Sequence, residues 1–110
     1  MVNNTRHLGY YCDKILFLET LRKYPLATFL NRKSATKYTF EETGFTVDEG
    51  VAILVPVAAL HYDPKYFPNP ENFDPERFSD ENKHNIVPYT YLPFGDGPRN
   101  CIGTFVHIEE

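Results

Sequence analysis

The sequence predicts a small mixed α+β fold with one helix, a few short strands and a long irregular segment. Three observations lead to this prediction. Apolar residues recur at helical spacing only near the start of the chain, and β-rich runs bounded by glycines follow. Seven prolines then interrupt the chain between Asp63 and Pro98. A chain of 110 residues has room for one domain with a modest core, so we treat residues 1–110 as a single domain.

A helix is expected from about Tyr10 to Tyr24, and Pro25 ends it. Cys12 lies on this helix and is expected to face the core as an unpaired thiol, because no framework of cysteines surrounds it. The apolar positions at helical spacing are Tyr11, Ile15, Leu18 and Leu21, with Arg22 beside the last of them.

Strands are expected next, in three short β-rich runs. Gly44 and Gly50 mark the turns between them. The runs are Ala27–Arg32, Lys37–Phe40 and Val51–Val57.

The chain from residue 58 onward changes character. Ala58–Tyr62 is expected to form a helical turn, and the stretch after it has little periodicity. An irregular stretch of this length is uncommon in a compact domain unless it is functional or packs on something else. We expect His61 to be packed and hydrogen-bonded rather than a metal ligand, and His84 and His107 to lie on the surface.

Composition narrows the function classes. The net charge of −4 argues against a nucleic-acid partner held through phosphate contacts. No run of about 18 apolar residues occurs, so no segment is expected to span a membrane. Eight tyrosines and nine phenylalanines could line a flat apolar ligand as easily as fill a core.

Glu19 and Arg22 lie three positions apart on the predicted helix and can pair. The plain interpretation is a surface ion pair worth a few tenths of a kcal/mol. Glu19 has apolar neighbours, however, and Arg77 in the sequence DPERF offers a second guanidinium. Two arginines on one buried carboxylate would form a rigid clamp, although spacing alone does not bring Arg77 to Glu19.

The segment PFGDGPRNCIG carries the sharpest signal. Gly95 and Gly97 permit backbone angles closed to other residues and leave room for a flat ligand. Arg99 precedes Cys101 by two residues and could neutralise a carboxylate or phosphate. The spacing does not fit a phosphate-binding loop, and no CxxC or HxxxH pattern completes a zinc site. A nucleophilic thiol lacks an evident base, with His107 still open, and a buried structural cysteine remains an alternative.

Three motifs together resemble one family. Along the chain, Glu19–Arg22 matches ExxR, Pro75–Phe78 matches PERF, and residues 94–103 match FxxGxRxCxG, which is the order of the family. These are the signatures of the cytochrome P450 haem-thiolate monooxygenases. The linking text of residues 54–78 resembles the microsomal branches of insects and vertebrates that oxidise xenobiotics. The fold implied is the carboxyl-terminal, proximal part of a mainly α fold: the ExxR helix, a small sheet, a meander and the cysteine loop.

The resemblance also implies roles for individual residues. Cys101 would be the axial thiolate on the iron of haem b. Phe94 would shield the sulfur, and the glycines of the loop, Gly95, Gly97 and Gly103, would let the backbone approach the haem. Arg99 and Arg32 would meet the haem propionates. The clamp of Glu19, Arg22 and Arg77 would be structural.

The implied reaction is insertion of one oxygen atom from O2 into a small apolar substrate. Electrons would come from NADPH through a flavoprotein reductase, at the cytoplasmic face of the endoplasmic reticulum membrane. Any membrane anchor would precede this segment. The family-like part covers residues 9–103, whereas residues 1–7 and 104–110 diverge and no AGxxT-like segment occurs. The alternative is a non-catalytic truncated fragment that binds haem weakly or does not fold alone.

Overall fold

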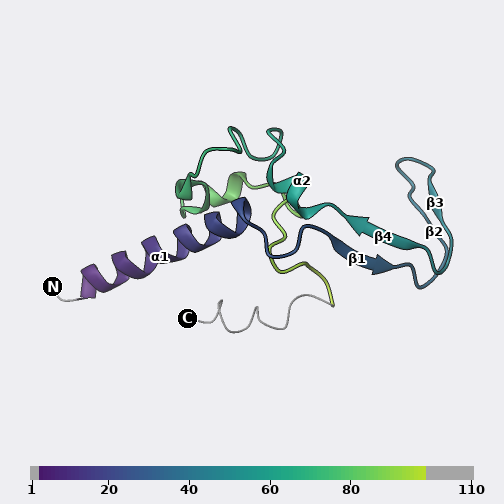
Figure 1. The fold of residues 1–110 in the computed structure, drawn as a ribbon, viewed down its shortest axis with the longest axis horizontal. Helices are drawn as coiled ribbons and strands as arrows, with labels where there is room; N and C mark the ends of the chain where they lie inside the picture. Colours follow the sequence, from purple (N-terminus) through teal and green to yellow (C-terminus); the bar gives the residue numbers. More distant parts are fainter. Residues whose placement is uncertain (1–2, 99–110) are drawn as a thin grey trace.

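The computed structural model describes residues 3–98, which form a helical body with a narrow β arm projecting from it (Figure 1). Helix α1, Asn3–Lys23, is the longest element. The chain then runs out and back through the arm, enters the short helix α2, Val57–His61, and continues as an irregular segment. This segment, residues 62–98, lies partly along α1 and is called the meander below.

Helix α1 begins earlier than the sequence predicts. The apolar periodicity starts at Tyr10, but the helix starts at Asn3, because a formed helix gains one hydrogen bond for each residue added and no proline precedes Tyr10. The predicted end is confirmed, since the helix stops at Lys23, ahead of Pro25. Of the apolar positions at helical spacing, Ile15 and Leu21 are buried, and Tyr11 and Leu18 are half-buried.

The arm consists of two antiparallel ladders in series. Strand β1, Leu30–Lys33, pairs with β4, Ala52–Val55. Beyond them, β2, Tyr38–Thr39, pairs with β3, Thr46–Val47, and makes the outer hairpin. The sequence does not predict β3, because two residues are too short to show an alternation.

The strand boundaries differ from the prediction for identifiable reasons. The carbonyl of Thr28 accepts a hydrogen bond from the Ala58 amide at 3.1 Å, so the residues before Leu30 contact α2 rather than a strand. Strand β4 ends at Val55 because Pro56 has no amide to donate to a ladder. The helical turn expected over Ala58–Tyr62 is confirmed as α2.

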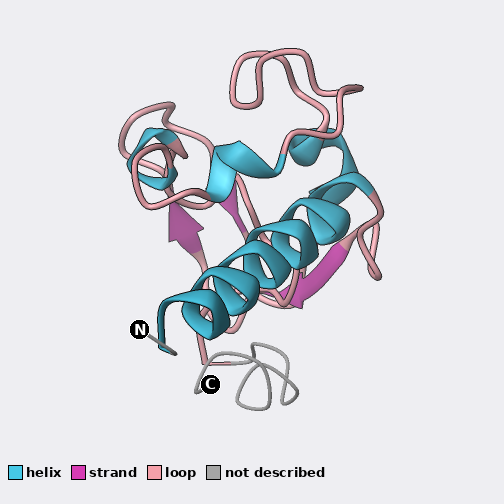
Figure 2. Ribbon diagram, turned by 90° about the vertical axis from the view of Figure 1, so that its left-hand side faces the viewer, coloured by secondary structure: helices cyan, strands magenta, loops and turns pink. Residues whose placement is uncertain are grey.

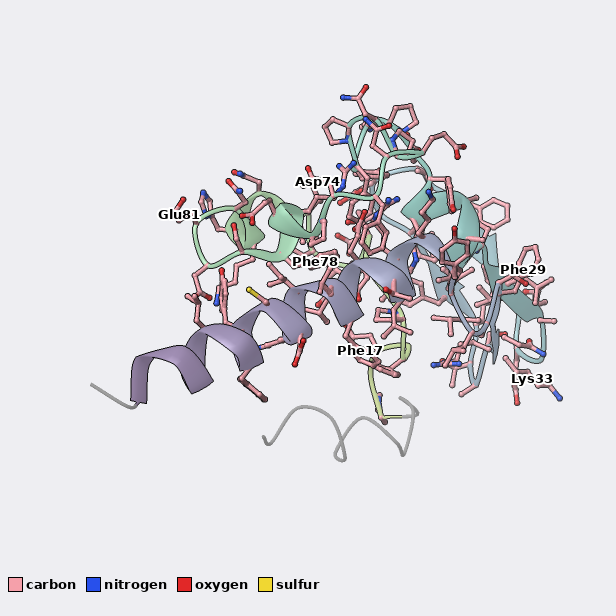
Figure 3. All side chains as sticks on the ribbon, turned by 60° about the vertical axis from the view of Figure 1, so that its left-hand side comes forward. Phe17, Phe29, Lys33, Asp74, Phe78 and Glu81 are labelled. Carbon is pink, nitrogen blue, oxygen red and sulfur yellow. The ribbon has the colours of Figure 1, made fainter. Side chains whose placement is uncertain are left out.

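The meander is irregular, as expected, apart from two short 3-10 helices, η1 at Pro75–Phe78 and η2 at Lys83–Asn85 (Figure 2). The Asp74 carboxylate caps η1 by accepting a hydrogen bond from the Glu76 amide at 3.2 Å. Phe78 is buried, and Figure 3 shows it beside α1. The meander is therefore held against the helix by η1.

Side chains from α2 and the meander also satisfy carbonyls near the end of α1. The Tyr62 hydroxyl donates to the Lys23 carbonyl at 2.6 Å, and the Tyr91 hydroxyl donates to the Leu18 carbonyl at 2.8 Å. The last carbonyls of a helix have no partner within it, so the Tyr62 contact supplies what the helix itself cannot, whereas the Tyr91 contact adds a second donor to a carbonyl inside the helix.

The core lies between α1, α2 and the meander. Its buried apolar residues are Ile15, Leu21, Val57, Phe67, Phe78 and Leu92. The arm has no comparable core: Val47 is buried there, while Leu54 and Phe45 are 62% and 64% exposed. Figure 3 shows Phe29 and Lys33 on the arm, away from this core.

Candidate functional site

The centre of the body is an ion pair on α1. Both side chains, Glu19 and Arg22, are fully buried. The Arg22 guanidinium donates from Nε to Glu19 Oε2 at 2.8 Å and from Nη2 to Oε1 at 2.7 Å. This two-point geometry is the strongest that an arginine and a carboxylate can form. The pair is thus a fixed buried element and not a surface ion pair.

Arg22 also holds the meander and α2. Its Nη1 donates to the His61 carbonyl at 2.9 Å, and its Nη2 donates to the carbonyls of Pro70 at 2.8 Å and Asn72 at 3.2 Å. The guanidinium lies 5.6 Å from the ring centre of Phe67. Sequence reasoning missed these partners, because a backbone carbonyl is the same at every residue and leaves no signal.

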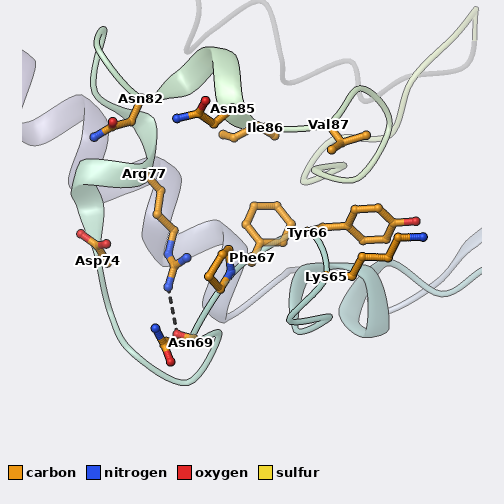
Figure 4. Close-up of a pocket in the computed structure, with 11 residues that line it drawn as sticks. Lys65, Tyr66, Phe67, Asn69, Asp74, Arg77, Asn82, Asn85, Ile86 and Val87 are labelled. Atoms are coloured by element: carbon orange, nitrogen blue, oxygen red, sulfur yellow. Dashed lines mark hydrogen bonds between the residues drawn. The ribbon is translucent and has the colours of Figure 1, made fainter.

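The structure brings Arg77 to the same carboxylate. Arg77 Nε lies 3.6 Å from Glu19 Oε1, which is an ion pair but too long for a hydrogen bond. Its Nη2 donates to the Asn69 carbonyl at 2.9 Å, shown as a dashed line in Figure 4. Glu19 Oε1 accepts a further hydrogen bond from the Asp74 amide at 2.9 Å. One carboxylate is therefore shared by the helix and two points of the meander.

His61 is buried at the end of α2 and uses both ring nitrogens. Nδ1 lies 3.1 Å from the Arg22 carbonyl oxygen, and Nε2 accepts a hydrogen bond from the Leu92 amide at 2.9 Å. Burial lowers the pKa of His61, and the nearby Arg22 charge lowers it further, against an opposing effect of the hydrogen bond to the Arg22 carbonyl. The prediction of a packed, hydrogen-bonded histidine is confirmed.

Tyr91 packs against this histidine. The two rings stack with centroids 5.2 Å apart, and Phe78 lies 4.7 Å from the Tyr91 ring on centroid distance. Burial raises the pKa of the Tyr91 phenol, and the Glu19 carboxylate adds to the rise. The hydroxyl therefore keeps its proton and can donate it in a hydrogen bond to the Leu18 carbonyl.

The start of the cysteine loop lies next to the arm. Gly95 and Gly97 have φ angles of +74° and +83°, as the sequence predicts for this loop. A Cβ placed on Gly95 would lie 3.5 Å from side-chain atoms of both Leu30 and Arg32. Arg32 Nη2 reaches the Asp96 carbonyl at 3.5 Å. Phe94 is half-buried. The remaining predicted residues of the loop, Arg99, Cys101 and Gly103, lie outside the described residues.

These motifs decide the family. The cytochrome P450 family model matches residues 11–106. The chain belongs to the cytochrome P450 family. It is 56% identical to cytochrome P450 9e2 of Blattella germanica over 98 residues, which are 88% of this chain and 18% of that protein. It is also 56% identical to cytochrome P450 3A31 of Mesocricetus auratus over 93 residues, 84% of this chain and 18% of that protein. A third relative, lithocholate 6-beta-hydroxylase of Mesocricetus auratus, is 52% identical over 93 residues, with the same coverage of both chains.

The chain thus spans about one fifth of the length of these P450 relatives. Within that share it contains all three motifs from which the resemblance was drawn. The insect and vertebrate sources of the relatives agree with the branches that residues 54–78 resemble.

The described residues at the loop fit a flat group that carries carboxylates. Gly95 and Gly97, both with positive φ, shape the start of the loop, and Gly95 lies beside the side chains of Leu30 and Arg32 in β1. Leu30 provides apolar surface there and Arg32 provides a guanidinium. Such a pair suits the apolar ring and the propionates of haem. Among residues 3–98 no group of three or more His, Cys, Asp or Glu side chains is placed to hold a metal ion.

One cavity was not anticipated from the sequence. It has a volume of about 420 Å³ and lies in the meander, where Figure 4 shows Phe67 and Arg77 on its wall beside Asn85, Ile86 and Val87. It shares Arg77 with the clamp and none of its lining with Phe94, Gly95 or Arg32. The cavity is therefore separate from the predicted haem residues.

The prediction that Cys12 faces the core is wrong, whereas the prediction that its thiol is unpaired is confirmed. Cys12 is an exposed free thiol on α1. The meander contacts the neighbouring residue instead, since the Tyr11 hydroxyl accepts a hydrogen bond from the Asp80 amide at 2.8 Å, and Cys12 is left facing solvent. His84 is exposed, as expected. No helix in the described range 3–98 has the length and apolar character needed to cross a bilayer.

Proposed function

We propose that this chain forms the thiolate side of the haem site in a cytochrome P450 monooxygenase. The observation that carries the proposal is the buried network of Glu19, Arg22 and Arg77, which joins the ExxR helix to the PERF segment. This network holds the meander, and the meander leads directly into the cysteine loop. Residues 9–103 are the part that performs this role, within one partial domain.

Each loop residue then has a distinct task. Cys101 donates its thiolate to the haem iron, and Phe94 keeps water from the sulfur. Gly95, Gly97 and Gly103 let the backbone lie close to the ring. Arg99 and Arg32 pair with the propionates.

When bound, haem b supplies the chemistry that activates dioxygen, with electrons from NADPH delivered by a flavoprotein reductase. The substrate is a small apolar molecule that receives one oxygen atom. The family resemblance to microsomal relatives supports a place at the cytoplasmic face of the endoplasmic reticulum membrane. The chain's own contribution is to bind and orient the haem; Glu19, Arg22 and Arg77 act only as the structural clamp.

A second candidate is a non-catalytic fragment that binds haem weakly or does not fold alone. The exposed apolar side chains of the arm favour it, since a β hairpin without a covered face has little stability of its own. Leu54 is 62% exposed and Phe45 64% exposed. Apolar side chains this exposed gain little free energy from folding.

One experiment separates the two candidates. The purified chain is mixed with haem, reduced and exposed to carbon monoxide, and its Soret band is recorded for three forms: unchanged, Cys101→Ala and Cys12→Ala. A strongly red-shifted band that disappears only in Cys101→Ala is the expected result, because a bound thiolate shifts the band and Cys12 lies on an exposed helix face. A band that survives in Cys101→Ala contradicts the proposed ligand. Absence of any band in the unchanged chain favours the second candidate.

A further inference from the structure

His61 lies where three parts of the body meet. It ends α2, its backbone carbonyl binds Arg22 of α1, and its ring contacts the meander through Leu92 and Tyr91. The side chain is fully buried, and the centroids of the His61 and Phe67 rings lie 6.2 Å apart in an edge-to-face arrangement. Neither the clamp nor the proposed haem contacts assign a role to this residue.

The hydrogen bonds determine which tautomer His61 adopts. The Leu92 amide can only donate, so Nε2 must carry a lone pair and no proton. The Arg22 carbonyl can only accept, so the proton must be on Nδ1. Both requirements are met by the neutral Nδ1–H form, and by no other form of the ring. The lowered pKa of His61 agrees with this state.

Leu92 is the last residue before the cysteine loop, and its backbone amide is bound by His61. It is buried, and Pro93, Phe94 and Gly95 follow it. Within the stretch from Leu92 to Pro98, Gly95 N donates to the Leu92 carbonyl at 3.4 Å and Gly97 N donates to Asp96 Oδ1 at 2.6 Å. Of the side chains outside this stretch, His61 binds the Leu92 amide and Arg32 approaches the Asp96 carbonyl at 3.5 Å. The bond to His61, at 2.9 Å, is the shorter and fully buried one.

We propose that His61 is a positioning residue for the haem ligand loop. Through its Nδ1–H tautomer it ties the Leu92 amide to the Arg22 carbonyl of α1, and so fixes where the backbone that leads to Cys101 leaves the clamp. This proposal rests on the proposed function, which identifies the loop as the one that carries the haem ligand. The two hydrogen bonds of the His61 ring, to Arg22 and to Leu92, are independent of that function.

Two substitutions separate positioning from simple core packing. Glutamine carries its amide oxygen near the place of Nε2 and can accept from the Leu92 amide, whereas asparagine places its amide near Nδ1 and cannot reach Leu92. His61→Gln is therefore the rescuing variant and His61→Asn the disrupting one. Tyr91→Phe is the matched control, because it removes the neighbouring bond to the Leu18 carbonyl and keeps the aromatic packing.

The test uses the protein at its natural length, loaded with haem. Hydrogen exchange of the Leu92 amide and the Soret band of the reduced carbon monoxide complex are measured in all four forms. His61→Asn is expected to accelerate exchange at Leu92 about tenfold and to reduce the thiolate band, because a buried amide loses its acceptor. His61→Gln is expected to leave Leu92 exchange within about threefold of the unchanged protein. Tyr91→Phe is expected to accelerate it by no more than the roughly fivefold that a loss of about 1 kcal/mol in overall stability allows.

The outcomes keep the two proposals apart. If no band depends on Cys101 in the unchanged protein, the proposed function fails, and exchange at Leu92 still decides the role of His61 as a tie. If the band is present but His61→Asn changes neither the band nor Leu92 exchange, the positioning role is overturned alone. Equal effects of His61→Asn and His61→Gln also overturn it, since they indicate packing only. If His61→Asn does not fold, the ¹⁵N shifts of His61 in the unchanged protein decide, and a proton on Nε2 contradicts the proposal.

Discussion

The helical body and the β arm of this chain handle polar and apolar groups in opposite ways. At the centre of the body, the charged pair Glu19 and Arg22 is fully buried and joined by short hydrogen bonds. In the arm, the ion pair of Lys37 with Asp48 is exposed and 3.9 Å long, while apolar side chains such as Phe45 face solvent. The body is thus fixed by contacts within the chain, whereas the arm gains little from its own residues.

The comparison has a functional side. The proposed haem loop leaves the body at Leu92 and passes the arm at Gly95, so it touches both regions. The body sets where the loop begins, and the arm contributes Arg32 and Leu30 beside it. We therefore expect substitutions in the body to change stability more strongly than equivalent ones in the arm.

The largest effect is expected from the clamp. Glu19→Gln leaves the Arg22 and Arg77 guanidinium groups without a buried counter-charge, and should lower the free energy of unfolding by about 3–5 kcal/mol. Denaturant unfolding of the protein at its natural length measures this. Asp48→Asn breaks the exposed pair of the arm and should change the free energy by less than about 1 kcal/mol. Similar losses for both would contradict the distinction between body and arm.

A smaller effect is expected from the loop glycine. Gly95→Ala places a side chain at φ +74°, and should lower the free energy of unfolding by about 1–2 kcal/mol. The strain comes from the backbone angle, because the nearest atoms to a new Cβ lie at 3.5 Å. Gly9→Ala is the opposite control. It lies exposed within α1 with nothing nearby, and should raise stability by about 0.5–1 kcal/mol. Thermal unfolding of both variants checks the two signs.

Next comes the hydroxyl of Tyr91. Tyr91→Phe removes the donor to the Leu18 carbonyl and should cost about 1 kcal/mol. Tyr38→Phe removes a hydroxyl from an exposed residue of the arm and should have no measurable effect. The chemical denaturation midpoints of the two variants are compared. An equal loss of stability in Tyr38→Phe would contradict the expectation that the body is more sensitive to substitution than the arm.

The last effect is absent at neutral pH and develops on acidification. The pKa of His61 is lowered in the folded state, so between its ordinary value of 6.5 and that lower value the unfolded chain binds a proton that the folded chain does not. Stability should therefore be complete above pH 6.5 and fall as the pH drops through this window. The charged group facing His61 is Arg22 on α1, and the phenol of Tyr91 stacks on its ring.

The measurement is the melting temperature against pH, with His61→Gln as the control. The variant should lose the part of the pH dependence that lies just below pH 6.5. The lowered pKa of the exposed Asp80 carboxyl, paired with Lys83, lies below its ordinary 3.8 and so affects only more acidic solutions. An identical profile for the variant would show that His61 does not titrate on unfolding.

The sequence predicts local features well and long-range ones poorly. Helix α1 and the turn α2 follow from periodicity and from Pro25, and the positive φ of Gly95 follows from its motif. The contact of Arg77 with Glu19 is outside the reach of spacing, since nothing local links the meander to α1. The carbonyl partners of Arg22 carry no side-chain signal at all.

Two misses have a common cause. Cys12 was expected inside because the helical period is right, but periodicity shows which face is apolar and not how far the opposing surface extends. The early start of α1 at Asn3 was missed for the related reason that apolar periodicity marks packing, whereas a helix can continue without it.

The carbonyls at the end of α1 have a consequence for the order in which the chain folds. Those of Arg22 and Lys23 are satisfied by His61 and Tyr62, which lie on the far side of the whole β arm in the sequence. The last helical turn therefore gains its stabilising contacts only after the arm has closed the loop between them. Closure of long loops precedes such contacts and slows folding, so this turn and α2 should become ordered together and late. On a ribosome the amino-terminal turns of α1 can form as they emerge, while its final turn must wait for residues synthesised much later.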